Sequence, residues 1–127
     1  MTRFLWICLG GALGTGARYL VTGWVLKLTG TAFPYGTLAV NLLGSFLLSA
    51  IVNVGLSTEW LSPTARLALT VGVLGAFTTY STFSHETMRL LQDGAWLAAG
   101  VNVALTVTVC LVASFLGFAA GRWLVGG

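Results

Sequence analysis

The stretch GVLGAFTTYSTFSHE, residues 72–86, decides the fold, because it is polar where the chain is otherwise apolar enough for a membrane. It carries six hydroxyl side chains and the closely spaced aromatic residues Tyr80 and Phe83. In hydrocarbon each polar group needs a partner, since an unsatisfied one costs several kcal/mol. We therefore expect protein or a cavity, and not lipid, around this stretch.

The first half of the stretch is poorly suited to a regular helix. Gly75 and the run 77–80 are modest or weak helix formers. We expect the helix to be interrupted there, near the middle of the membrane, because an unwound turn frees carbonyls that can hold ions. Once the helix resumes, one face holds Tyr80, Phe83, Ser84 and Thr87. Each hydroxyl taken alone also has a simpler interpretation, a hydrogen bond to the carbonyl four residues earlier.

The composition places the chain among integral membrane proteins. Of its 127 residues 57% are hydrophobic and 7% are charged, and the mean hydropathy is +0.93. Because a span needs about 20 apolar residues, we expect one all-α transmembrane domain with four helices, at about 3–26, 36–56, 66–92 and 96–124. The net charge of +3 comes from scattered basic residues that form no patch, which argues against a nucleic-acid partner.

Glycines four residues apart predict close helix packing in two spans. Gly10 and Gly14 form such a pair in the first span, and Gly117 and Gly121 form one in the fourth. The first 17 residues also imitate a signal peptide, with an arginine, an apolar run and small residues. The glycine pair favours the interpretation as a packed first span.

The other spans carry isolated polar side chains. Asn41 in the second span either bonds to a neighbouring helix or donates to a passing ion. Arg18 in the first span either reaches outward to the membrane surface or faces a wet vestibule. The fourth span has a polar ridge at four-residue intervals, formed by Asn102, Thr106, Cys110 and Ser114.

The remaining reactive or titratable side chains predict little chemistry. Glu86 and Arg89 lie three residues apart, which predicts an ion pair near the end of the third helix. His85 is interpreted as an interfacial residue, because it has no partner pattern for a metal. Cys8 and Cys110 lack metal-ligand spacing and are interpreted as small apolar fillers. With no phosphate-binding loop, dinucleotide fingerprint or nucleophile–base pair, the sequence predicts no enzyme.

The basic residues are divided evenly between the two sides of the membrane. Alternating spans put Arg3, Arg66 and Arg122 on one side, and Arg18, Lys27 and Arg89 on the other. The rule that positive charge stays inside then gives no orientation. Four helices alone can hardly enclose a pathway, and a chain without orientation bias can pair with an inverted copy. We therefore predict an antiparallel homodimer of dual topology.

Three segments together resemble the Fluc fluoride channels, also called CrcB. They are the run Gly75–Ser84, the segment GTLAVNLLG at 36–44, and the stretch Gly14–Tyr19 with its arginine. The resemblance covers all four helices. It implies a passive fluoride-selective channel in the bacterial inner membrane, a dual-topology homodimer with two pores that gives fluoride resistance by exporting the ion.

Carried over residue by residue, the resemblance implies two kinds of site. Backbone carbonyls of Gly75 and Thr78 from both subunits would hold a structural sodium ion at the centre of the dimer. The ion pathway would contain the pore asparagine Asn41 and the aromatic pair Tyr80 and Phe83. Its other members would be Arg18, Thr79, Ser81, Thr82, Ser84, Asn102, Thr106 and Cys110. Tyr80 departs from the usual phenylalanine, and Ala76 from a usual glycine.

The residue types of this stretch suit fluoride, a small and strongly hydrated anion. Hydroxyls, an amide and ring edges can replace water without a fixed charge that would bind the ion too tightly for conduction. One alternative is a small proton-coupled multidrug exporter, which needs a carboxylate in the middle of a span. Another is a non-transporting packing subunit, which would explain the glycines but not the hydroxyl-rich stretch.

Overall fold

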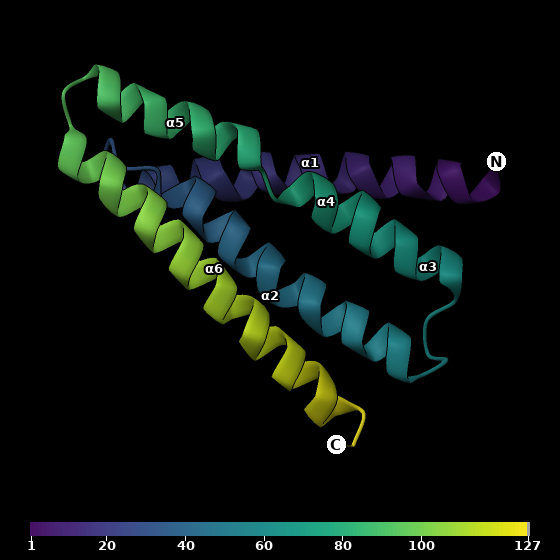
Figure 1. Ribbon diagram of the computed structural model, residues 1–127. Coiled ribbons are helices and arrows are strands. Elements are labelled where there is room, and N and C mark those ends of the chain that lie inside the picture. Colours follow the sequence, from purple (N-terminus) through teal and green to yellow (C-terminus); the bar gives the residue numbers. More distant parts are fainter. Residues whose placement is uncertain (127) are drawn as a thin grey trace.

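A computed structural model describes residues 1–126, and these form helices without a strand. The chain order is α1 (Thr2–Thr29), α2 (Tyr35–Ser57), α3 (Pro63–Leu67), the π-helix η1 (Ala68–Leu74), α4 (Gly75–Phe77), α5 (Tyr80–Gln92) and α6 (Trp96–Leu124) (Figure 1). Four helical segments are long and apolar enough to cross a membrane: Thr2–Thr29, Tyr35–Ser57, Pro63–Gln92 and Trp96–Leu124. The expected all-helical architecture with four long apolar helices is confirmed.

The first helix extends past its expected end at Leu26 to Thr29. It ends at Gly30, which has a φ of 61° and donates its N–H to the Leu26 carbonyl at 2.8 Å. This left-handed conformation favours glycine, because a Cβ would clash with the backbone. Residues 30–34 connect α1 to α2, which leads away from the end of α1 at an angle (Figure 1).

The third membrane-length segment is built from four successive pieces. Ser62 caps α3 by accepting from the Ala65 N–H at 3.1 Å, and Pro63 occupies its first turn. The π-helix η1 follows, with hydrogen bonds spaced five residues apart in place of four. After the single turn of α4, Thr78 and Thr79 have extended backbone angles, and α5 begins at Tyr80.

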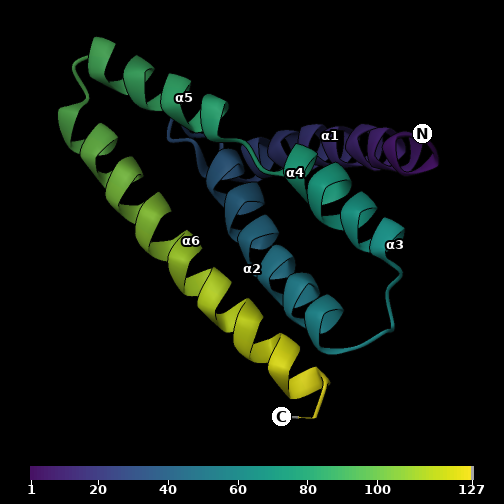
Figure 2. The same ribbon diagram turned by 45° about the vertical axis from the view of Figure 1, so that its right-hand side comes forward.

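Helices α2 and α6 lie side by side along most of their length in both views (Figures 1 and 2). Their seam is set by the glycine pair of α6. A Cβ added at Gly117 would overlap the Phe46 carbonyl, and one at Gly121 would lie 2.9 Å from the Ala50 carbonyl oxygen. The predicted close packing at this pair is confirmed, since only glycine permits this approach of two backbones.

A second glycine seam joins α1 to η1. A Cβ at Gly14 would overlap the Val73 carbonyl, and one at Gly72 would lie 2.7 Å from the Ile7 carbonyl oxygen. The predicted packing role of Gly10 and Gly14 is confirmed by these contacts. The two seams hold α1 against η1 and α2 against α6, and α5 extends from α4 toward the start of α6 (Figure 2).

The buried core is small, and large apolar side chains cover the outside. Val40, Leu74 and Phe77 are buried, whereas Leu13, Leu97 and Phe115 are among many apolar residues that are mostly exposed. Such an apolar surface is unfavourable in water, whereas the hydrocarbon of a bilayer accommodates it. The inside is unusually polar, because four of its buried side chains are Thr37, Asn53, Asn102 and Thr106.

Candidate functional site

The extended residues between α4 and α5 are held by an amide from α2. Asn41 Oδ1 accepts from the Thr79 N–H at 2.8 Å, and Asn41 Nδ2 donates to the Thr79 carbonyl at 3.1 Å. We call this pair of hydrogen bonds the Asn41 clamp. In an uninterrupted helix the Thr79 N–H would donate to the Gly75 carbonyl, so the Asn41 clamp leaves that carbonyl without its helical donor. One N–H of the Asn41 amide remains for another acceptor.

An arginine from α1 reaches the same segment from the other side. Arg18 Nε donates to the Ala76 carbonyl at 3.0 Å, and the side chain is partly buried. The Arg18 side chain thus turns toward the third span, and its position in a wet vestibule stays a prediction. Arg18 and Asn41 therefore bond to the backbone at the two ends of residues 76–79.

Side chains within the segment complete its local structure. Thr79 Oγ1 accepts from the Thr82 N–H at 3.2 Å, which caps the start of α5. Thr78 Oγ1 donates to the Leu74 carbonyl at 3.0 Å, and the Thr78 methyl group lies where a Cβ on Gly44 would be. The break is therefore an ordered feature, fixed by α2 and by its own hydroxyls.

A groove of about 380 Å³ runs beside the break, between α2, α5 and α6. Six of the predicted pathway residues line it: Asn41, Thr79, Tyr80, Phe83, Thr106 and Cys110. The Tyr80 and Phe83 rings meet edge to face, with centroids 5.7 Å apart and an interplanar angle of 63°. Two aromatic rings, an amide and hydroxyl groups thus line one groove, which are residue types that can hold an anion weakly.

A second cavity, of about 260 Å³, lies on the α1 side of the break. It is lined by threonine hydroxyls and by Arg18, and its members are Thr15, Arg18, Tyr19, Thr22, Thr37, Thr79, Thr82 and Glu86. Thr79 borders both this cavity and the groove. The eight predicted pathway residues that line these two spaces therefore form two neighbouring sets that meet at Thr79.

Three predicted pathway residues lie outside both spaces. Ser81 is exposed, and Ser84 Oγ donates to the Tyr80 carbonyl at 3.1 Å, the simpler interpretation given for such hydroxyls. Asn102 is only 2% exposed and donates to Thr87 Oγ1 at 2.9 Å, which fastens α6 to α5. Of the predicted sodium ligands, Thr78 borders the groove and Gly75 does not.

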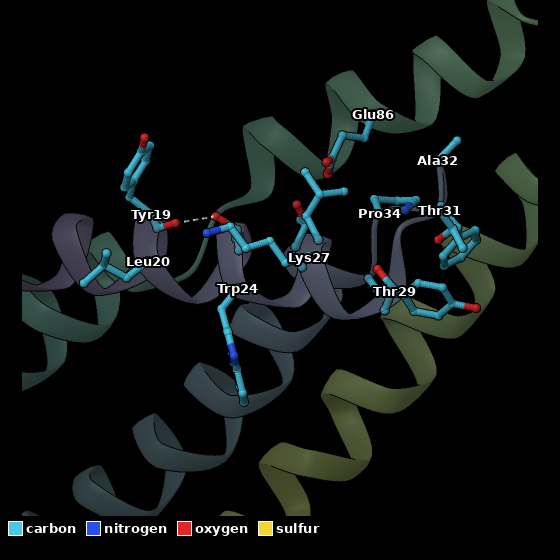
Figure 3. A pocket seen from close by; sticks show the side chains of 16 residues that line it. Tyr19, Leu20, Trp24, Lys27, Thr29, Thr31, Ala32, Pro34 and Glu86 are labelled. Carbon is cyan, nitrogen blue, oxygen red and sulfur yellow. Dashed lines mark hydrogen bonds between the residues drawn. The ribbon is translucent and has the colours of Figure 1, made fainter.

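A third cavity, of about 720 Å³, lies between α1, the α1–α2 connection and α5 (Figure 3). Lys27, Thr37 and Glu86 are among its polar lining residues, together with the aromatic residues Tyr19, Trp24, Phe33 and Tyr35. Figure 3 shows Glu86 reaching from α5 toward α1. Sequence reasoning missed Thr37 and Glu86 as site residues, although Glu86 lies four residues after Thr82 and so on the same side of α5.

The ion pair predicted between Glu86 and Arg89 is wrong. No ion pair joins them within residues 1–126, and Glu86 Oε1 is buried without a hydrogen-bond partner. The three-residue spacing allowed the pair, but the Glu86 side chain turns toward α1 and the Arg89 side chain is exposed. Spacing within one helix carried no information about the neighbouring helix.

Residues 5–118 match the family described as CrcB-like protein, Camphor Resistance (CrcB). The chain belongs to the CrcB-like family. This CrcB-like protein is 53% identical over 127 residues to the "Fluoride-specific ion channel FluC" of Sorangium cellulosum (strain So ce56), with 100% of both chains covered.

Two further relatives carry the same name. The protein of Anaeromyxobacter sp. (strain K) is 50% identical, with 99% of this chain and 100% of the relative covered. The protein of Geobacter sulfurreducens (strain ATCC 51573 / DSM 12127 / PCA) is also 50% identical, with 98% and 100% covered. With its four membrane-length helices, this CrcB-like chain is a multi-pass integral protein of the bacterial membrane.

Proposed function

We propose that the chain is a fluoride-selective channel through which cytoplasmic fluoride leaves passively, down its electrochemical gradient. The observation that carries the proposal is full-length identity of 53% to a relative named as a fluoride-specific ion channel. The groove supports it, because the amide of Asn41 and the ring pair of Tyr80 and Phe83 offer donors without a fixed charge. The chain is not an enzyme in this proposal. The exporter alternative gains no support from the relatives.

The pathway in this proposal has the eleven predicted members, with unequal support from their positions. Asn41, Thr79, Tyr80, Phe83, Thr106 and Cys110 contact the groove, while Arg18 and Thr82 border the adjoining cavity. Ser81, Ser84 and Asn102 are assigned to the pathway by resemblance alone. The pathway would cross the break in the third span near the middle of the bilayer, where Thr78 and Thr79 are extended.

The channel would work as an antiparallel homodimer with two pores. Tyr80 is 80% exposed although it lies in a membrane-length segment, and its groove is open on one side, so a second copy would cover both. A two-fold axis in the membrane plane would give two equivalent grooves. A reporter on the C-terminus should give signal from both sides of the membrane, and signal from one side only would rule out dual topology.

A structural sodium ion would sit between the two copies, held by carbonyls of Gly75 and Thr78. The donor chemistry fits, since unwound carbonyl oxygens suit sodium and the Asn41 clamp takes the helical donor of Gly75. Two carbonyls from each copy would make four ligands. When bound, sodium would supply one fixed positive charge near the pathway. Fluoride flux that followed the direction of a sodium gradient would contradict a static role.

Liposomes that contain the purified protein test the proposal. We expect rapid fluoride efflux and no chloride efflux, because a strongly hydrated ion needs the dense donors of the groove. Phe83→Ile should abolish most of the flux, whereas Phe115→Ile, on an exposed part of α6, should not. If neither ion moves, Tyr80→Phe decides between a pore obstructed by the tyrosine hydroxyl and an incorrect assignment of function.

A further inference from the structure

The carboxylate of Glu86 has an unusual environment. Glu86 Oε1 is the only buried side-chain nitrogen or oxygen atom in residues 1–126 without a hydrogen-bond partner. A buried oxygen without a donor is unfavourable, and none of residues 1–126 donates to this one. The groups that can relieve it are a proton, or a donor that enters from the cavity.

Glu86 lies where two cavities meet. It lines both the 720 Å³ cavity, which contains Lys27, and the 260 Å³ cavity, which contains Arg18 and Thr82. The smaller cavity in turn borders Thr79, which it shares with the groove of Tyr80 and Phe83. An ion that moved from the larger cavity to the groove would therefore pass Glu86.

We propose that Glu86 controls the entry of fluoride into the smaller cavity through its protonation state. The ionised carboxylate repels the anion, whereas the protonated carboxyl presents an O–H group that can donate to it. The passage is therefore open when Glu86 carries a proton and restricted when it does not. The inference rests on the proposed channel function and adds a regulatory residue to it.

The groups around Glu86 leave its charge without a direct counterion. From α1 it is faced by Arg18, whose Nε is bonded to the Ala76 carbonyl, and by Lys27 and Tyr19; from α2 it is faced by Tyr35. His85 and Arg89 of its own helix are exposed, and the part of α6 that packs on α5 contributes the neutral Asn102. Neither Arg18 nor Lys27 forms an ion pair with Glu86 within residues 1–126.

Fluoride current across a planar bilayer tests the proposal, with the fluoride ion concentration held constant and the pH changed equally on both sides. Current is the suitable measurement, because neutral hydrogen fluoride carries no charge. From about pH 8 to about pH 4, a range that contains carboxyl titration, the wild-type current should rise at least about fivefold, the effect of one charge about 4 Å away in water. Glu86→Gln should give a high current that no longer depends on pH.

Four further variants sharpen the result. Glu86→Ala should also be independent of pH but carry less current than Glu86→Gln, because alanine has no donor; it serves too if the glutamine variant fails to fold. Glu59→Gln, outside all these cavities, and His85→Asn should keep the wild-type pH dependence. Arg89→Gln should keep it as well, since Arg89 forms no ion pair with Glu86.

Two classes of result would overturn the proposal. A wild-type current that is independent of pH, pH dependence that persists in Glu86→Gln, or its loss in His85→Asn would each show that Glu86 is not the controlling group. In those cases the channel function itself would stand. Absence of fluoride current from the wild type at every pH would instead overturn the channel function and this inference together.

Discussion

The glycine seams and the break in the third span are held to their neighbouring helices in opposite ways. At the seam of Gly117 with Phe46, both backbones have complete helical hydrogen bonds, and the contact needs only the absence of a side chain. At residues 76–79 the helix is open, and Arg18 and Asn41 supply hydrogen bonds that the helix has lost. Helices with complete hydrogen bonds pack closely where side-chain atoms are absent, whereas the interrupted backbone is stabilised by polar side chains from neighbouring helices.

This difference predicts different responses to substitution. A larger residue at a seam glycine should destabilise the fold through steric overlap with the facing helix, and the loss should grow with the volume added. Substitution of a residue that bonds to the interrupted backbone should destabilise the fold by leaving backbone groups without partners, even where the new side chain fits. Three substitutions separate the two kinds of failure.

The largest effect is expected at Asn41. Asn41→Leu is similar in size but leaves the Thr79 N–H and carbonyl without their partners, which should cost about 4 kcal/mol of unfolding free energy. Unfolding in detergent and fluoride efflux should both show the loss. Leu43→Met, on the exposed side of the same helix, is the matched control. Stability equal to the control would mean that Asn41 does not hold the break.

A smaller effect is expected at the α1–η1 seam. Gly14→Val would overlap the Val73 carbonyl and push the helices apart, at a cost of about 3 kcal/mol. Gly16→Val in the same helix has nothing within 4 Å and should change the unfolding free energy little. Equal effects of the two substitutions would show that helix propensity, and not contact, governs this helix.

The smallest effect is expected at Ser84. Its hydroxyl donates to the Tyr80 carbonyl of its own helix, so Ser84→Ala should change the unfolding free energy, measured in detergent, by less than about 0.5 kcal/mol. Thr82→Ala, which removes a hydroxyl that borders the smaller cavity, provides the contrast. Fluoride efflux then tests the pathway assignment of Ser84 separately: a clear loss in Ser84→Ala would support the assignment, and wild-type flux would contradict it.

Local sequence carried much of the fold. Hydropathy and length predicted four apolar helices, and the spacing of Gly10 with Gly14 and of Gly117 with Gly121 predicted close seams that the contacts confirm. These features depend on residues within one helix and on the physics of lipid. They could therefore be predicted without any knowledge of which helices are neighbours.

Long-range contacts could not be predicted in the same way. The bond from Arg18 to the Ala76 carbonyl joins residues 58 positions apart, and its chemistry left two positions for the arginine open. The spacing of Glu86 to Arg89 likewise allowed an ion pair that the structure lacks, because the Glu86 side chain turns toward α1. Both outcomes depend on the relative rotation of helices, which hydropathy does not specify.

The π-helix η1 has a consequence for that rotation. Its wider turns contain about one residue more than those of an α-helix, and each residue of an α-helix corresponds to about 100° of rotation. Removal of one residue from Ala68–Leu74 would allow an ordinary helix, but it would turn everything after it by that angle relative to α1. Ala76 and Thr79 would then point away from Arg18 and Asn41. The additional residue of the π-helix therefore sets the rotation that brings these two backbone groups to their partners.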